Sequence, residues 1–206
     1  SQPMGFYSPR SLVADAQRHG VQVRPVDVNH SDWDCTLEPA TDGDRPAQDR
    51  ASPMRAIRLG MRLVRDLGET EGRAIEAARR DGPFDGIAGL SRRTPLDRDA
   101  LSALARSGAL RSFGMDRRQA LWAVRGLYDL PLFRGLLRNE AQAPLPAPAP
   151  VDDMREDFHM VGLSVDLDPV GMIRPKLDRQ GVLTVSVVQT RDTDQIVRVA
   201  GIISNR

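Results

Sequence analysis

The sequence predicts a mainly α-helical protein with a few short strands. Apolar residues recur at helical spacing in several stretches between residues 55 and 126. Cap residues and glycines bound these stretches, as where Asp97 precedes and Gly108 follows one of them. Strict alternation of apolar and polar residues, which is typical of strands, extends only over short runs such as residues 21–26 and 56–61.

The first 54 residues predict one helix, one strand and a loop. Ser8 is a helix cap, Pro9 suits the first helical position, and Gly20 ends the helix. Residues 21–26 alternate as a short strand. Residues 38–54 are rich in Pro, Asp, Gly and Ala, which favours a surface loop.

The rest of the chain divides at a proline-rich segment. Residues 55–138 predict a strand followed by helices with short connections. These helices are expected at residues 69–80, from 84 or 85, at 97–107 and from 116. Residues 139–150 predict a semi-rigid linker, because Pro and Ala dominate and largely alternate from residue 141 onward. Residues 151–206 predict a helix (151–161), a turn at Asp168-Pro169, and strands near 183–188 and 196–203.

Composition limits the class of protein. A chain of 206 residues forms one large domain or two small ones, with a core built from aliphatic residues because aromatics make up only 4%. The single cysteine, Cys35, excludes an internal disulfide and fits a reducing cytoplasm. No apolar run approaches the ~20 residues that cross a bilayer, so no membrane partner is expected. Ser1 at the start and a strand-like run at the end suggest a piece of a longer protein.

The net charge of +1 hides an uneven distribution. Residues 1–54 hold 5 arginines and 8 acids, and residues 139–206 hold 7 basic and 10 acidic residues. Residues 55–138 hold 17 arginines and 10 acids, a net charge of +7. This concentration favours contact with nucleic-acid phosphates, for which arginine is well suited. The alternative is a solvated, arginine-rich helical face.

Residues 63–75 have helix-hairpin-helix character. In this motif a glycine-bearing turn directs backbone N–H groups, and the start of the next helix, toward a DNA phosphate without reading base sequence. Gly68 is the first glycine, whereas Thr70 occupies the position where a second is usual. The candidate DNA contacts are Arg65, Gly68, Thr70, Gly72 and Arg73. The alternative is an ordinary helix-turn-helix corner that packs a core.

A second helical pair follows at residues 87–107. It lacks the turn glycines, so we expect it to serve packing more than phosphate binding. Arg92, Arg93 and Arg98 could still reach a DNA backbone. Two such pairs in tandem would suit a domain that spans a minor groove.

Residues 129–133 are similar to the Gln-Leu-x-Leu-Phe peptide that bacterial proteins insert into the sliding clamp. Leu130, Leu132 and Phe133 would fill an apolar pocket, and Asp129 replaces the glutamine. The alternative is that these apolar residues cap the helical core.

Residues 29–35 gather His30, Cys35 and aspartates. Zinc sites need paired ligands at set spacing, so a hydrogen-bonded polar loop is the favoured interpretation. No nucleotide-binding motif or nucleophile elbow is present. We therefore assign no cofactor-binding or metal-binding residue.

Residues 2–9, 15–21, 24–29 and 31–34 resemble the fingers of bacterial C-family DNA polymerases. The resemblance is to the error-prone branch (ImuC type), related to the polymerase III alpha subunit, and covers nearly the whole chain. It implies a distal fingers segment at residues 1–54 and a tandem helix-hairpin-helix domain at 55–138. After the 139–150 linker, residues 151–206 would lead into an OB-fold.

The resemblance also implies an activity for the parent protein. It would be a DNA-directed DNA polymerase that copies past lesions, using Mg²⁺ held by palm aspartates upstream of this segment. No acidic pair in the segment matches the family's palm motif, so we assign no catalytic residue and expect the segment itself to be inactive. Its implied partners are primer–template DNA, the sliding clamp and other mutagenesis-complex proteins. The alternatives are a non-enzymatic helix-hairpin-helix DNA-repair adaptor and a protein-docking module.

Overall fold

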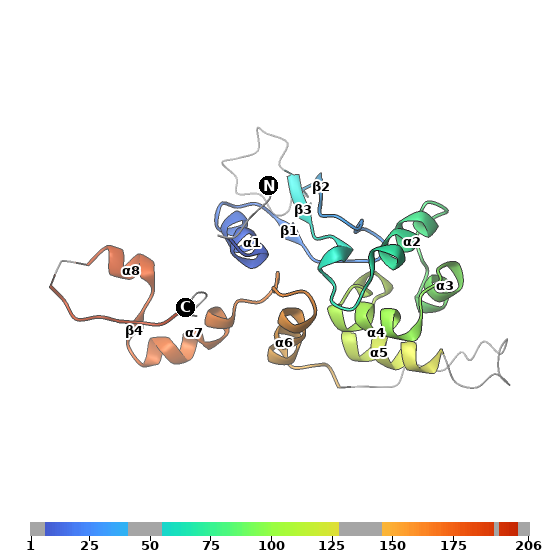
Figure 1. Ribbon diagram of the computed structural model, residues 1–206. Coiled ribbons are helices and arrows are strands. Elements are labelled where there is room, and N and C mark those ends of the chain that lie inside the picture. Colours follow the sequence, from blue (N-terminus) through green and yellow to red (C-terminus); the bar gives the residue numbers. More distant parts are fainter. Residues whose placement is uncertain (1–6, 41–54, 128–145, 192–193, 202–206) are drawn as a thin grey trace. The chain divides into compact units, whose positions relative to one another are not determined.

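The computed structural model describes residues 7–40, 55–127, 146–191 and 194–201 (Figure 1). The helices are α1 (Pro9–Arg18), α2 (Glu69–Arg79), α3 (Ile87–Arg93), α4 (Arg98–Ser107), α5 (Arg117–Gly126), α6 (Pro150–Met160), α7 (Pro169–Arg179) and α8 (Val185–Gln189). The strands are β1 (Val23–Arg24), β2 (Thr36–Pro39), β3 (Arg55–Arg58), β4 (Val182–Leu183) and β5 (Arg198–Val199). Two 3-10 helices are η2 (Met61–Leu63) and η3 (Arg111–Phe113). The predicted mainly helical class is confirmed.

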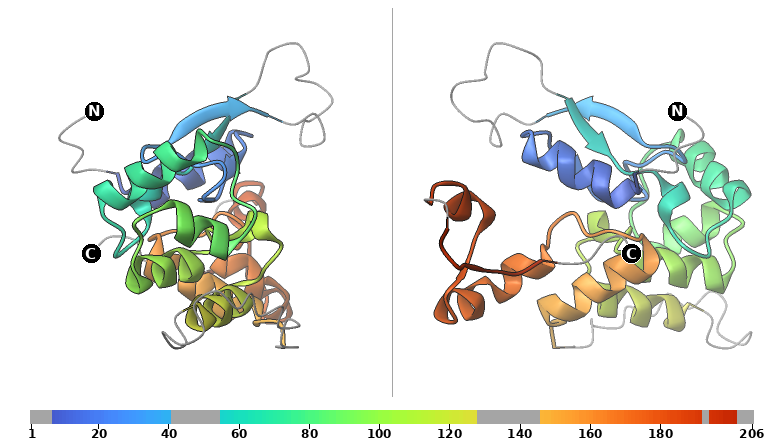
Figure 2. Two further views of the ribbon diagram at one scale, coloured as in Figure 1. Left: turned by 90° about the vertical axis from the view of Figure 1, so that its right-hand side faces the viewer. Right: turned by 60° about the vertical axis from the view of Figure 1, so that its left-hand side comes forward.

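Contacts divide the chain into two compact units, Ser1–Val165 and Asp166–Arg206. The first unit contains the helices α1 to α6 and a three-stranded sheet. Both views of Figure 2 show the sheet and α1 on one side of this unit and α4 and α5 on the other. No helix within the described ranges is long and apolar enough to cross a membrane.

Helix α1 begins where the sequence predicts it. The Ser8 hydroxyl accepts a hydrogen bond from the Ser11 amide at 3.2 Å, and Pro9 takes the first helical position. Gly20 follows with φ +78°, the left-handed conformation that a glycine adopts without steric cost. The cap and the glycine therefore fix both ends of this helix.

The sheet has the order β1-β3-β2, with β3 parallel to β1 and antiparallel to β2. Glu38 on β2 joins all three strands: its carboxylate accepts from Arg24 at 2.6 Å and from Arg58 at 2.8 Å. Burial raises the pKa of Glu38, but the hydrogen bonds and charges of Arg58 and Arg24 outweigh it and hold that pKa below its ordinary value. An ionic cluster thus reinforces a sheet of very short strands.

The core of the first unit is aliphatic, as the composition predicts. Its largest fully buried side chains include Met61 of η2, Ile75 of α2, Leu90 of α3, Leu104 of α4 and Met160 of α6. One continuous cluster runs from the sheet through these helices. The two helical pairs therefore share a single core.

Helix α6 lies beyond the predicted linker yet packs against the helical pairs. Its Asp157 carboxylate, nearly buried, accepts from Arg117 of α5 and from the Ser164 hydroxyl. Its Phe158 ring lies under Arg10 of α1, 4.7 Å from guanidinium carbon to centroid. Paired charges thus attach α6 to α5, and the first unit extends to Val165.

The second unit differs from the sequence prediction in two places. Asp168-Pro169 was predicted to be a turn, but it starts α7: the Asp168 carboxylate accepts from the amides of Val170 and Gly171. The predicted strand at 183–188 is also wrong beyond Leu183, because the Thr184 hydroxyl accepts from the Val187 amide and starts α8. In each case a side-chain cap outweighed the pattern on which the prediction rested.

Candidate nucleic-acid interface

The first hairpin joins η2 to α2 through residues 64–68. Val64 and Leu67 are buried, and the Arg65 amide donates to the Met160 carbonyl of α6 at 2.7 Å. Asp66 adopts φ +63°, so it holds the left-handed position of the turn. Only glycine takes that conformation freely, although aspartate tolerates it better than most residues. Asp66 therefore adds both strain and a negative charge to the turn.

Gly68 is the N-cap of α2. Its amide donates to the Glu71 carboxylate at 2.5 Å. The next amides, those of Glu69, Thr70 and Glu71, have no acceptor within the helix, as in any helix start. Thr70 lies inside the first turn of α2 rather than in the hairpin turn. The turn positions are thus Asp66 and Gly68, two residues earlier than the sequence suggested.

Gly72 and Arg73 are bound to the rest of the protein. A methyl group at Gly72 would lie 2.9 Å from Cζ3 of Trp33 and closer still to Cε3, so this glycine lets the indole pack on α2. Arg73 makes ion pairs with Glu76 at 3.2 Å, Glu69 at 3.4 Å and Asp34 at 3.5 Å. The hydrogen bond to Glu76 raises the pKa of Arg73, and Glu69 adds to the effect.

The second hairpin joins α3 to α4 through residues 94–97. The Thr94 hydroxyl donates to the Leu90 carbonyl at 2.6 Å, and Leu96 is buried. The Asp97 carboxylate accepts from the Ala100 amide at 2.8 Å and caps α4. Gly108, with φ +76°, ends that helix. This hairpin needs no turn glycine, because polar side chains close both of its helices.

The arginines of the second hairpin have two different roles. Arg93 donates to the carbonyls of Ala78, Gly82 and Pro83 and lies 4.6 Å from the centroid of the Phe84 ring. It therefore closes the end of α2. Arg92 and Arg98 are exposed, and neither side chain has a hydrogen-bond or ion-pair partner among the residues that the structure describes. Arg65 in the first hairpin is in the same situation.

The two hairpins also differ in charge. Residues 65–73 contain two arginines and three acids, whereas residues 92–99 contain three arginines and two acids. Acids near a helix start stabilise the helix but repel an incoming phosphate. The second hairpin is thus the more favourable of the two for an anion.

The polar loop at residues 29–35 attaches to α2. Glu76 accepts from the Trp33 amide, Arg79 pairs with Asp32, and the Cys35 sulfur accepts from the Gly60 amide at 3.3 Å. Within the described ranges, no three His, Cys, Asp or Glu side chains are grouped so as to hold a metal ion. The loop holds the helix that follows the first hairpin, a role that the sequence did not indicate.

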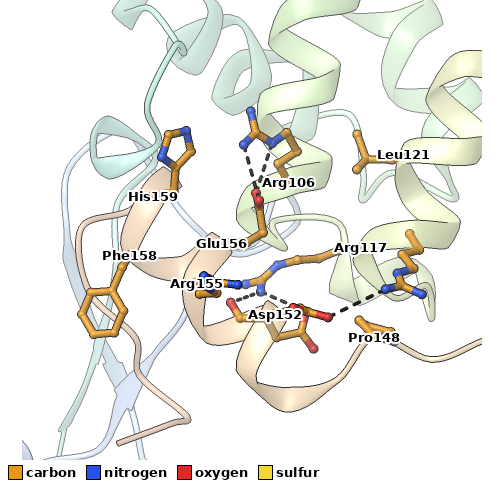
Figure 3. Close-up of a pocket in the computed structure, with 11 residues that line it drawn as sticks. Arg106, Arg117, Leu121, Pro148, Asp152, Arg155, Glu156, Phe158 and His159 are labelled. Atoms are coloured by element: carbon orange, nitrogen blue, oxygen red, sulfur yellow. Dashed lines mark hydrogen bonds and ion pairs between the residues drawn. The ribbon is translucent and has the colours of Figure 1, made fainter. Parts of the chain in front are cut away.

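A cleft of about 890 Å³ lies among the side chains of α4, α5 and α6 (Figure 3). Arg106 and Glu156 point toward each other across it, 3.1 Å apart, and Arg117 pairs with Asp153 at 3.1 Å. Acids of α6 therefore neutralise arginines that counted toward the basic middle of the sequence. The acidic run of α6 is the sequence signal of these pairs, but the sequence alone does not show that α6 packs on α4 and α5.

The predicted clamp-binding residues Asp129, Leu130, Leu132 and Phe133 lie outside the described residues.

Comparison with known proteins adds two findings. Residues 20–120 match a family model described as a helix-hairpin-helix motif, a range that contains both hairpins. The whole chain is similar to proteins named error-prone DNA polymerase. It is 41% identical to that of Methylococcus capsulatus over 98% of the chain, 42% identical to that of Alkalilimnicola ehrlichii over 100%, and 40% identical to that of Burkholderia pseudomallei over 100%. The chain spans about a fifth of the length of these relatives, 20%, 19% and 19% respectively.

Proposed function

We propose that this chain, which is similar over nearly its whole length to error-prone DNA polymerases, is the segment with which such a polymerase binds duplex DNA without reading its sequence. The observation that carries the proposal is the exposure of Arg65, Arg92 and Arg98 on the two hairpins. Their guanidinium groups are engaged with no other described residue and are therefore available to phosphate oxygens.

Backbone amides would supplement these arginines. The amides of Glu69 and Thr70 at the start of α2, together with Gly68, offer donors and the positive end of the helix dipole to a phosphate. Glu71 already occupies the Gly68 amide, which weakens this site. We assign Gly72, Arg73 and Arg93 to positioning the hairpins rather than to DNA contact, since each is bound within the protein.

The chemistry belongs to the parent protein. We propose that the parent adds deoxynucleotides opposite damaged templates, with Mg²⁺ supplied to palm aspartates outside this chain. Within the described ranges no three His, Cys, Asp or Glu side chains are grouped so as to hold a metal ion. In the same proposal, residues 1–54 belong to the fingers and residues 151–206 lead into an OB-fold.

Protein partners are a separate proposal. The sliding clamp would bind the peptide formed by Asp129, Leu130, Leu132 and Phe133. Asp129 lacks the amide donors of the usual glutamine. Other mutagenesis proteins would assemble with the parent. This proposal rests on the position and pattern of the peptide in the sequence alone.

The test measures binding of the 206-residue chain to two labelled duplexes of equal length and unrelated sequence, by fluorescence anisotropy at several salt concentrations. We expect equal affinities that fall steeply with salt. Arg92→Ala and Arg98→Ala should each weaken binding, whereas Arg18→Ala removes an exposed charge outside the matched range and should not. Absence of binding at low salt, or a strong preference for one sequence, would contradict the proposal.

A further inference from the structure

Helix α5 has two chemically different faces. Arg117, Ala120 and Val124 are buried against the rest of the first unit. At about 100° per residue, Arg118, Trp122 and Arg125 fall within an arc of roughly 60° on the other side. These three residues form what we call the α5 outer face.

Trp122 is the centre of the α5 outer face, with 55% of its surface exposed. Tryptophan is strongly buried in most proteins because its ring carries a large apolar area. The other tryptophan of this chain, Trp33, is partly buried and packs on Gly72. An exposed indole on an ordered helix therefore marks a surface suited to a flat, apolar ligand.

The charges on the helix are all positive. Helix α5 contains three arginines and no acidic residue. Arg125 is exposed, and its side chain has no partner within the described part of the chain. Arg118 reaches the Pro146 carbonyl at 3.3 Å and the Asp152 carboxylate at 3.9 Å, with 46% of its side chain exposed. So long and exposed an ion pair is weak, and a phosphate can displace it.

We propose that the α5 outer face binds single-stranded DNA, with one unpaired base stacked on Trp122 and the flanking phosphates paired with Arg118 and Arg125. The two arginines are seven residues apart, about 10 Å along the helix axis, which leaves room for a base between them. Every base has a π-face, so such stacking is tolerant of sequence, and guanidinium groups reinforce it. The duplex contact of the hairpins does not need an unpaired base, so this site adds a second mode of DNA binding.

The experiment compares binding to labelled oligo-dT of about 15 nucleotides with binding to a duplex, for the whole chain and three variants. We expect Trp122→Leu to weaken oligo-dT binding about tenfold and Trp122→Phe, which keeps a stacking ring, to weaken it less than threefold. Leu37→Ala is the control, because Leu37 is a similarly exposed apolar residue on β2. Circular dichroism checks that each variant is folded.

Four results would overturn the proposal. The first two are that the unaltered chain does not bind oligo-dT, or that Trp122→Leu binds it within twofold of the unaltered chain. The third is that Trp122→Leu and Trp122→Phe lose equal oligo-dT affinity, and the fourth is that sedimentation shows Trp122-dependent self-association without a change in oligo-dT binding. Duplex binding that persists in Trp122→Leu separates this site from the hairpins. If the unaltered chain binds oligo-dT but does not bind the duplex, the result contradicts only the function proposed above.

Discussion

The two hairpins share a core but hold their turns by different means. In the first, Asp66 occupies a left-handed turn position, and α2 is held from outside by Trp33 and by the pairs of Arg73. In the second, Thr94 and Asp97 close the turn with their own side chains. The first hairpin thus depends on residues far away in sequence, whereas the second is locally determined.

The two hairpins also differ in how many of their arginines are free to contact a phosphate. In the first hairpin, Gly72 and Arg73 are engaged in packing and ion pairs within the protein. Asp66 in its turn, and Glu69 and Glu71 in the first turn of α2, add negative charge. The second hairpin uses one arginine, Arg93, for structure and leaves Arg92 and Arg98 exposed. The second hairpin departs further from the sequence motif but is the better placed to bind phosphate. The property that distinguishes the two hairpins is the number of arginines unpaired within the described residues, not the presence of a turn glycine.

The largest expected effect removes the outside support of the first hairpin. Gly72→Ala forces a methyl group into the Trp33 ring and should lower the free energy of unfolding by about 1–3 kcal/mol. Gly126→Ala is the matched control, since Gly126 is also helical and has nothing within 4 Å of an added methyl group. Urea unfolding of both variants measures the difference. Equal stability of the two would show that Trp33 does not hold α2.

The next effect separates two adjacent arginines of the second hairpin. Arg93→Ala leaves the carbonyls of Ala78, Gly82 and Pro83 without this donor and should cost about 1–2 kcal/mol of stability. Arg92→Ala should change stability by less than about 0.5 kcal/mol. Thermal unfolding followed by circular dichroism compares them. A stability loss at Arg92 as large as that at Arg93 would remove the distinction between free and structural arginines.

A smaller effect compares a free arginine with a paired one in DNA binding. Arg98→Ala should reduce the slope of log affinity against log salt by about 0.9, the value for one lost phosphate contact. Arg73→Ala should leave the slope nearly unchanged, because three carboxylates already engage that side chain. Anisotropy titrations with a duplex give both slopes. A reduced slope for Arg73→Ala together with an unchanged slope for Arg98→Ala would place the phosphate contact in the first hairpin.

The smallest effect relieves the charge at the first hairpin. Glu71→Gln keeps an acceptor for the Gly68 amide but removes a negative charge from the start of α2. Duplex affinity at low salt should rise about two- to fivefold, and the gain should shrink as salt screens the charge. Unchanged affinity would mean that no phosphate approaches this turn.

Local signals in the sequence were sufficient for most helix boundaries. Ser8, Asp97 and Asp116 start helices as predicted, because a cap acts on residues three positions away. The same reasoning would have found α7 at Asp168-Pro169, which repeats the arrangement of Ser8-Pro9. Helix α8 was missed because its β-branched residues favour strands when no cap is considered.

The candidate site was harder to predict. The arginines that face solvent and those that bind carbonyls or carboxylates look alike in sequence, as Arg92 and Arg93 show. Which of them is free depends on contacts between distant segments, such as that of Arg73 with Asp34. The left-handed turn position at Asp66 was missed for another reason: Gly68 was taken as the first turn glycine and Thr70 as the position of the second, which places the turn two residues too late.

The most direct test of the central claim is the salt dependence of duplex binding by the chain and by a variant with Arg65, Arg92 and Arg98 all changed to Ala. If these exposed arginines are the phosphate contacts, the slope of log affinity against log salt should fall by roughly 2.7, or about 0.9 for each arginine. The variant should remain folded, because none of the three side chains has a partner among the described residues. A folded variant with an unchanged slope would contradict the claim and move the DNA contact away from the hairpins.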